Sequence, residues 1–375
     1  MIASLLAGNK RVGIASNSHR AISLLMAEAA KVATKIGAKF QGVKIGGDEE
    51  EGGGIHPRIH WAKAAKDVFA FGALPNLIGG TAWAFSHQLA AGQLDYLFVD
   101  EAGQVSTANL VGMSPSTTNI VLIGDQMQLS QPIQGSHPGE SGTSTLEYLL
   151  QERRTIPEDL GIFLGKTWRL HPAICKFISG AVYDDRLRNQ PVTATRELRF
   201  GSAKRRWITK TAGLLYIPVE HEGNTYECEE EGACIGELVD ELLGQRIVTD
   251  NGSTRALTKD DILVVAPYNL QVRLLAAMLP EVRVGTVDKF QGQQAPIVIY
   301  SMCASSGDAS SRGIEFLFCR NRLNVAISRA QTLAIVVAHP SLVRTHCSSI
   351  EQMELLNIYC RAVQEAESTP LSAPA

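Results

Sequence analysis

The chain lacks the cysteine pattern that marks most metal-cluster proteins. Its seven cysteines include no Cys-x-x-Cys pair, the spacing typical of zinc and iron–sulfur sites. This absence argues against such a site and leads us to expect a reducing, cytoplasmic environment.

Long apolar runs and a strong positive charge are also missing. No stretch approaches the roughly 18 residues that span a membrane, and the apolar start, Ile2 to Leu6, is too short for a signal peptide. The formal net charge is −3, so any contact with nucleic acid must come from a local groove rather than from a general field. With 375 residues and 45% hydrophobic residues, the chain has the composition of a soluble protein with room for two domains.

Acidic residues directly follow a buried strand in the first half of the chain. Leu97, Phe98 and Val99 form an apolar run typical of a parallel-sheet strand that is buried on both faces. The run ends at Asp100 and Glu101, and open α/β sheets bind ligands at the carboxyl ends of their strands. Asp100 could hold Mg²⁺ through a water, and Glu101 could orient and deprotonate an attacking water. An acidic pair after a strand is more often a solvated turn, so this pair alone does not decide the matter.

A second strand of the same kind favours the catalytic interpretation. The apolar run from Ile120 to Ile123 ends at Gly124 and Asp125, and Gln128 follows three residues later. A glutamine at this place can reach a γ-phosphate and report its loss. Together the two strands predict the nucleotide-binding edge of a parallel sheet, with Asp125 among the nucleotide contacts.

The segments DEAGQ, at 100–104, and GDQMQL, at 124–129, resemble motifs II and III of the superfamily 1 helicases. The similar branch contains the RNA helicase of nonsense-mediated decay and the eukaryotic Okazaki-fragment nuclease-helicase. The resemblance implies an α/β fold of two RecA-like parallel-sheet domains with a nucleotide cleft between them. It also implies ATP and Mg²⁺ as cofactors and a single-stranded nucleic acid as the partner.

Further segments resemble the family motifs that contact one strand. Small residues in such segments let a nucleic-acid backbone approach closely. The segments lie near Asn17, at Gly79-Gly80-Thr81, near Tyr268, and in the run from Val284 to Gln293. The resemblance implies nucleic-acid contacts by Ser16, Asn17, His19, Thr81, Pro267, Tyr268 and Thr286.

Two other segments resemble motifs that direct arginines at the γ-phosphate. Trp168-Arg169-Leu170-His171-Pro172 is similar to the family's Tyr-Arg-Met-His-Pro, and the run from Arg322 to Ala330 is similar to motif VI. A planar guanidinium stabilises charge on the transferring phosphoryl oxygens, an effect worth roughly 10³ to 10⁵ in rate in related systems. The implied catalytic residues are Glu101, Arg169, Arg329 and Gln128, and the implied cofactor contacts are Asp100, Asp125, Trp168, Gly292 and Gln294.

The sequence departs from the family pattern in two places. The family's Gly-x-x-Gly-x-Gly-Lys-Thr loop, whose amides cradle phosphates, should lie just upstream of the helix predicted from Ile2 to Ala7, and it is missing. We therefore expect a fragment or truncated gene product that is inactive alone, rather than a degenerate protein. Gln294 stands where the family has a glutamate that binds the ribose. A glutamine can still accept or donate a hydrogen bond there, so we expect a shift in nucleoside preference without loss of binding.

Several of these residues have simpler interpretations. His19 and His171 fit turn or capping roles better than catalysis, and Tyr268 could be an ordinary half-buried aromatic. The basic segment from Arg186 to Lys210 could be a strand-binding arm, but a solvated connection is favoured.

The motif positions predict the domain organisation. Domain one is expected at about 1–150, with a small, mostly helical insertion at about 25–78 and without its N-terminal strand and phosphate loop. Domain two is expected at about 151–345, and a C-terminal helix with a disordered tail at 346–375. Strands are expected at 11–16, 94–101, 119–125, 161–168, 261–267, 282–287, 295–302 and 332–338. The C-terminal helix is expected to bury a face made of Ile350, Met353, Leu356, Cys360 and Val363. The acidic, glycine-rich stretch from Gly46 to Gly54 is expected to be a solvated loop.

These observations predict an ATP-dependent helicase that moves along one strand, with DNA favoured over RNA and 5′ to 3′ polarity implied by the branch. The chain looks most like the helicase half of bacterial proteins that join a RecB-like nuclease to such a motor, so a nuclease domain is expected upstream. The alternative is a non-catalytic nucleic-acid-binding or regulatory protein built from the same two domains.

Overall fold

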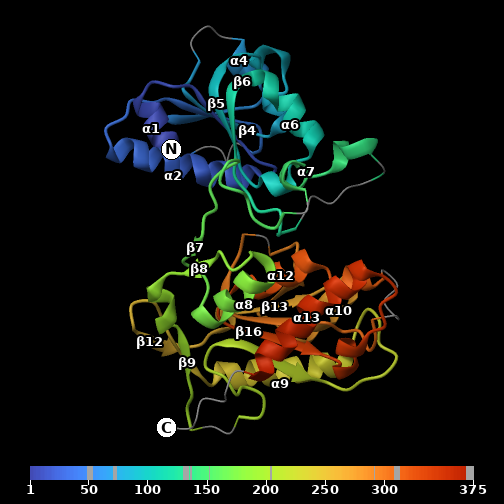
Figure 1. The fold of residues 1–375 in the computed structure, drawn as a ribbon. Coiled ribbons are helices and arrows are strands. Elements are labelled where there is room, and N and C mark those ends of the chain that lie inside the picture. Colours follow the sequence, from blue (N-terminus) through green and yellow to red (C-terminus); the bar gives the residue numbers. More distant parts are fainter. Residues whose placement is uncertain are drawn as a thin grey trace. The chain divides into compact units, whose positions relative to one another are not determined.

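The computed structural model describes residues 1–48, 54–70, 74–129, 135, 137–151, 153–202, 205–290, 292–307 and 313–368. The chain forms two compact units, Met1–Arg153 and Arg154–Ala375, coloured blue to green and green to red in Figure 1. Two predicted features, the acidic centre of the Gly46–Gly54 loop and the disordered tail, fall on 49–53 and 369–375 and lie outside the described residues. In the described part of the chain, no helix combines the length and the apolar character that a membrane crossing requires.

Unit 1 is built around a six-stranded sheet in the order β3-β2-β4-β1-β5-β6. All of its strand pairs are parallel. The strands are β1 (Val12–Ala15), β2 (Gly42–Ile45), β3 (Ile59–Ala62), β4 (Leu77–Gly80), β5 (Leu94–Val99) and β6 (Thr117–Leu122). The helices are α1 (Ile2–Ala7), α2 (His19–Lys35), α4 (Lys66–Phe69), α5 (Ala82–Phe85), α6 (Thr107–Met113) and α7 (Thr145–Leu150).

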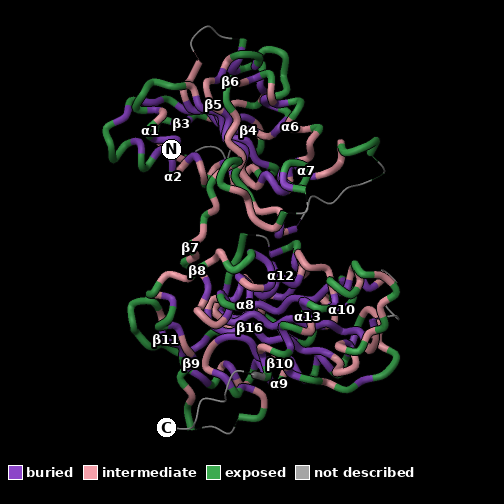
Figure 2. The backbone as a smooth tube through the Cα atoms, viewed as in Figure 1, coloured by how far each residue is buried: buried purple, intermediate pink, exposed green. Residues whose placement is uncertain are grey.

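The alternation of side chains along the strands divides the core of unit 1 into two layers. Val12 and Ile14 of β1 point to the face that α1 and α2 cover. Leu97 and Val99 of β5 point to the opposite face, where α5, α6 and α7 pack. Burying each such side chain contributes about 1.5 to 3 kcal/mol, and the buried backbone of Figure 2 follows these central strands. Both faces are thus covered, as the apolar runs predicted.

Unit 2 contains a five-stranded parallel sheet in the order β10-β16-β15-β13-β14. Its strands are β10 (Gly213–Pro218), β13 (Ile262–Ala266), β14 (Arg283–Thr286), β15 (Ala295–Ser301) and β16 (Ala330–Ala338). Small sheets beside it contain β7 (Lys166–Thr167), β8 (Arg188–Asn189), β9 (Glu197–Arg199), β11 (Arg246–Val248) and β12 (Thr254–Ala256). Its helices are α8 (Pro172–Val182), α9 (Glu229–Leu243), α10 (Asn269–Met278), α11 (Ile314–Leu317), α12 (Arg320–Ser328) and α13 (Ile350–Ser368).

Helices cover both faces of this second sheet as well. On one face, α9 and α10 enclose a single apolar cluster that includes Ile262, Val264 and Ala266 of β13 and Ile299 of β15. On the other face, α8, α12 and α13 pack against the strands (Figure 1). The two parallel sheets confirm the predicted α/β fold.

Three local predictions differ from the structure. The segment 25–78 is not a mostly helical insertion, because it supplies β2, β3 and the start of β4 to the first sheet, and β2 and β4 are buried there. The strand expected at 161–168 shrinks to the two residues of β7, outside the large sheet. The C-terminal helix forms, but Ile350 and Met353 are exposed, and the buried face shifts to Leu356, Tyr359, Val363 and Ala366.

Candidate nucleotide and nucleic-acid sites

The predicted residues of unit 1 follow the carboxyl ends of neighbouring parallel strands. β1 lies between β4 and β5, with Ala15 opposite Gly80 on one side and Val99 on the other. Ser16, Thr81 and Asp100 directly follow these three positions. The structure therefore brings residues from both predicted groups to one edge of the sheet, the edge where open α/β sheets bind ligands.

The acidic pair after β5 is held by backbone contacts. The Asp100 amide donates a hydrogen bond of 2.8 Å to the carbonyl of Ala15. Burial raises the pKa of the Asp100 carboxyl, and a backbone hydrogen bond from Glu101 opposes that rise. Glu101 has a φ of 54°, a left-handed conformation that non-glycine residues rarely adopt.

The loop after β6 arranges Asp125 and Gln128 as a pair. Oδ1 of Asp125 accepts a hydrogen bond of 2.9 Å from the Met127 amide. Oδ2 of the same carboxylate accepts one of 2.9 Å from Nε2 of Gln128. The Gln128 amide group is thus oriented by the Asp125 carboxylate.

The loops after β5 and β6 touch through glycine backbone. A Cβ added at Gly103 would meet the carbonyl oxygen of Asp125 at 2.6 Å, and one added at Gly124 would meet the Ala102 amide at 2.7 Å. The Ala102 amide also donates a hydrogen bond of 2.8 Å to the carbonyl of Ile123. Glycine is required here because two backbones approach without room for a side chain.

This contact predicts a loss of stability in Gly103→Ala. The new methyl group would force the Asp125 loop to move, and we expect the free energy of unfolding to fall by about 1 to 3 kcal/mol. The measurement is urea denaturation of the full chain, followed by circular dichroism. Gly8→Ala is the control, because its Cβ would lie 3.4 Å from the nearest atom, and a change within about 0.5 kcal/mol is expected there. Equal stability of both variants would contradict the tight contact.

The predicted strand-binding residues of unit 1 differ in their access to solvent. Ser16 is buried, while Asn17 is exposed and donates a hydrogen bond of 2.6 Å to the carbonyl of Gln104. Thr81 precedes α5 and makes no side-chain capping hydrogen bond. Trp83, two residues later, is 85% exposed and was not singled out from the sequence. An aromatic residue beside a Gly-Gly-Thr segment is the signal that could have identified it.

His19 begins α2 and packs against a glycine turn. A Cβ at Gly47 would lie 2.9 Å from the His19 ring, and one at Gly46 would lie 3.2 Å from it. Ser18 caps the helix by accepting a hydrogen bond from the Ala21 amide. The packing agrees with a turn role for His19, which was the simpler interpretation.

In unit 2 the two predicted arginines converge on one short segment. Nε of Arg169 donates a hydrogen bond of 2.9 Å to Oε1 of Gln294. Nη1 of Arg329 donates one of 2.9 Å to the carbonyl of Gln293. Nη1 of Arg169 also approaches the Ser328 carbonyl at 3.5 Å, next to Arg329 in the chain. Two arginines far apart in the sequence thus contact neighbouring residues of one segment in the folded unit.

The side chains around this segment differ in exposure. Arg329 is 3% exposed, whereas Trp168 is 67% exposed and presents an aromatic face to solvent. Gly292 has a φ of 74°, which lets the segment turn before Gln294. The exposed aromatic ring of Trp168 can stack on a base, next in the chain to the guanidinium of Arg169.

Arg196 holds this region and was missed from the sequence. Its guanidinium donates to the carbonyls of Arg169 and Trp168 and pairs with the Asp250 carboxylate, at 2.7 Å from Nη2. The side chain is almost buried. Arg196 lies in the basic segment, and composition alone does not distinguish a buried arginine that holds neighbouring backbone from a solvated one.

Other cations of the segment from Arg186 to Lys210 also have partners within unit 2. Arg186 donates a hydrogen bond of 2.7 Å to the Ile156 carbonyl, and Arg206 pairs with Glu237 at 3.0 Å. Lys210 donates to the Ala366 carbonyl. These contacts favour the connecting role over a free strand-binding arm.

His171 is a helix cap. Its Nδ1 accepts a hydrogen bond of 3.3 Å from the Ala173 amide at the start of α8. Burial, aided by the nearby Arg196, lowers the pKa of His171 to about 4. The ring is therefore neutral at pH 7 and able to accept, which confirms the capping interpretation.

The other predicted strand-binding segments of unit 2 lie after β13 and β14. Pro267 and Tyr268 are both buried, and the Tyr268 ring stacks on Phe316 with a centroid distance of 5.2 Å. Asn269, at the start of α10, is exposed. Thr286 ends β14, and its Oγ1 accepts a hydrogen bond of 3.4 Å from the Lys289 amide. The side chain that this edge presents after β13 is therefore that of Asn269, rather than the Tyr268 ring.

Comparison with known proteins gives a family match and several partial relatives. A profile of the family described as AAA domain matches residues 142–341. The chain is 26% identical over 262 residues to "DNA replication ATP-dependent helicase/nuclease JHS1" of Arabidopsis thaliana, covering 65% of this chain and 19% of that protein. It is 28% identical over 279 residues to "DNA polymerase alpha-associated DNA helicase A" of Schizosaccharomyces pombe, covering 70% and 39%. It is 28% identical over 290 residues to "Probable RNA helicase armi" of Drosophila melanogaster, covering 67% and 24%. The chain spans less than half the length of each of these relatives.

Proposed function

The chain belongs to the AAA domain family, and from this premise we propose that it is the motor part of a superfamily 1 helicase that hydrolyses ATP to move along a nucleic acid. The observation that carries the proposal is the convergence of Arg169 and Arg329 on the segment from Gly292 to Gln294. Arginines held in this way are suited to charge on a transferring phosphoryl group. The names of the three relatives, all helicases, support the same activity.

The residues of unit 1 would supply the metal and the base. Asp100 would hold Mg²⁺ through a water, and Glu101 would take a proton from the attacking water. Gln128, fixed by Asp125, would sense the γ-phosphate through its remaining oxygen. Their common position at the carboxyl edge of one parallel sheet supports these roles.

The residues of unit 2 would supply contacts to the base and the ribose. Trp168 would stack on the adenine, and Gln294 would bind the ribose in place of the family's glutamate. The hydrogen bond between Arg169 and Gln294 would then link ribose recognition to the arginine that faces the phosphate.

We propose DNA as the substrate and 5′ to 3′ as the direction of movement. DNA is supported by the names of two of the three relatives, and RNA by the third. The polarity rests on the resemblance of the motifs. A nuclease domain in the same polypeptide is a further proposal, and the helicase/nuclease among the relatives supports it.

Binding of a single strand to unit 1 provides the first test. Trp83 would stack on a base beside Thr81, and we expect Trp83→Ala to weaken binding of a fluorescent oligothymidylate by about 10-fold. Trp83→Phe keeps an aromatic face and should retain most of the affinity. Val111→Ala removes another exposed apolar side chain of unit 1 and should change nothing. Fluorescence anisotropy gives the affinities of the unmodified chain and the three variants, and equal values for the two Trp83 variants would contradict stacking.

A further inference from the structure

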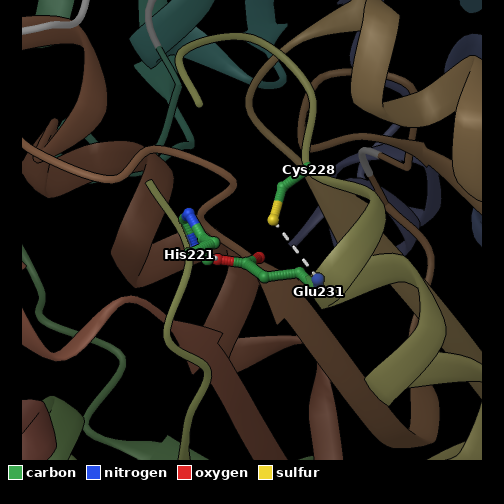
Figure 3. A group of neighbouring side chains, drawn as sticks. All are labelled: His221, Cys228 and Glu231. Atoms are coloured by element: carbon green, nitrogen blue, oxygen red, sulfur yellow. Dashed lines mark hydrogen bonds and ion pairs between the residues drawn. The ribbon is translucent and has the colours of Figure 1, made fainter. Parts of the chain in front are cut away.

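A second polar cluster is buried in unit 2, and none of the predicted site residues belongs to it. His221, Cys228 and Glu231 each offer one donor atom, and these atoms lie within 4.8 Å of one another (Figure 3). The side chains of His221 and Glu231 are 0% exposed. A buried carboxylate of this kind is costly unless it is fully hydrogen-bonded.

Glu231, in the first turn of α9, is fully hydrogen-bonded. Its Oε2 accepts a hydrogen bond of 2.6 Å from the Ser301 hydroxyl and one of 3.0 Å from the Cys303 amide. Its Oε1 lies 3.2 Å from Nε2 of His221. Cys303 has a φ of 52°, a conformation rarely adopted by non-glycine residues, and this conformation accompanies the contact of its amide with Glu231.

The other atoms of the cluster also have partners, which argues against a metal site. Nδ1 of His221 lies 2.8 Å from the Ser305 hydroxyl, whose oxygen accepts a hydrogen bond of 2.9 Å from the Asn224 amide. The Cys228 sulfur accepts one of 3.2 Å from the Glu231 amide, as Figure 3 shows. Burial raises the pKa of the Cys228 thiol to about 12, so the thiolate that a metal requires is disfavoured.

Gln271 joins this cluster to the first turn of α10. Its Nε2 donates a hydrogen bond of 3.0 Å to the Ser301 hydroxyl, the same group that donates to Glu231. Its Oε1 accepts one of 2.7 Å from the Cys228 amide at the start of α9. Gln271 is 0% exposed, and the exposed Asn269 lies two residues before it.

We propose that Glu231 and Gln271 are positioning residues for the strand-binding segment after β13. The buried network fixes the first turn of α10 to the end of β15 and to α9. It thereby holds Asn269 and the neighbouring backbone where a single strand would be bound. The inference rests on the proposed nucleic-acid function, but the network itself can be tested without nucleic acid.

The isosteric change Glu231→Gln separates hydrogen bonding from charge. The Gln oxygen can accept from Ser301 and Cys303, and its amide can donate to His221 if the imidazole proton moves to Nδ1. The Ser305 hydroxyl oxygen can then accept a hydrogen bond from the protonated Nδ1 of His221. We therefore expect Glu231→Gln to retain the strand affinity within about 2-fold. If Glu231 were a metal ligand, loss of its carboxylate would instead weaken metal binding.

The test compares Glu231→Gln with Gln271→Met in the full chain. Gln271→Met leaves the Cys228 amide without its acceptor and removes the donor to the Ser301 hydroxyl, which keeps its own hydrogen bond to Glu231. We expect binding of an oligothymidylate of about 15 nucleotides to weaken by about 10-fold. Glu229→Gln is the control, because Glu229 is an exposed acid in the same turn of α9. Combining Gln271→Met with Asn269→Ala should add little to either change alone, because both act through one segment.

Hydrogen exchange tests the buried network separately from the proposed nucleic-acid binding. Gln271→Met should accelerate exchange of the first amides of α10 while the rest of unit 2 stays protected. Failure of the unmodified chain to bind any strand, together with this local change, would refute the nucleic-acid function but support the positioning network. Unchanged exchange, additive effects of the two substitutions, or one equivalent of zinc in the purified protein would each overturn the network.

Discussion

Glu101→Gln is expected to reduce nucleic-acid-stimulated ATP hydrolysis by about 10² to 10⁴-fold. The amide keeps the shape of the side chain but cannot take a proton from the attacking water. Nucleotide binding should persist, because the Asp100 carboxylate remains for Mg²⁺. The measurement is ATP turnover with and without an oligonucleotide, in a polypeptide that joins a Gly-x-x-Gly-x-Gly-Lys-Thr loop to this chain, and binding of a fluorescent ATP analogue in parallel.

The control is Glu28→Gln, which removes an exposed acid of unit 1 on α2. It should leave turnover unchanged. Normal turnover in Glu101→Gln would eliminate Glu101 as the base. Absence of turnover in the unmodified polypeptide, combined with strand binding that is indifferent to ATP, would favour the alternative of a non-catalytic nucleic-acid-binding protein.

The strands that carry the predicted chemistry could be identified from the sequence because they contain apolar runs, although β6, at the edge of its sheet, is only partly buried. β5 and β6 both form apolar runs that end at acidic residues, and β15 and β16 form longer ones. Such runs need no tertiary information to be recognised. The two-sheet architecture follows from these strands and from the order of the motifs.

The short strands β2 and β4 escaped recognition for a physical reason. Each has four residues, and β4, Leu77–Gly80, contains two glycines that fit because α2 and α5 pack closely against it. A Cβ at Gly79 would clash with the sulfur of Met26. The requirement for glycine at this position therefore comes from a helix that is distant in the chain. The local sequence around Gly79 holds no information about that contact.

The site was predictable in its residue types but not in its supporting contacts. The motif segments indicated Arg169 and Arg329, but not that Gln294 and Gln293 would hold them. Arg196 escaped because its partner Asp250 lies 54 residues away. Tyr268 was predicted from the sequence to contact a nucleic-acid strand, but aromatic neighbours pack against its ring and bury it.

Arg169→Ala is expected to lower the maximal rate of ATP hydrolysis by about 10³-fold. Arg169 is preferable to Arg329 for this test, because Arg329 is 3% exposed and its removal would leave a cavity in unit 2. Arg169→Lys keeps the charge but loses the planar fork and the contact of Nε with Gln294, so it should recover only a small part of the rate. The measurement is ATP turnover in the polypeptide that includes the phosphate loop.

A matched arginine separates the loss of a phosphate contact from a general loss of charge. Arg188→Ala removes an exposed arginine of unit 2 whose side chain bonds only to the adjacent Leu187 carbonyl among the contacts of the described residues. It should leave the rate unchanged, and strand affinity without nucleotide should be the same in both variants. If Arg169→Ala weakened strand binding as strongly as ATP turnover, Arg169 would belong to the nucleic-acid site, and Arg329 would remain as the candidate for the phosphoryl group.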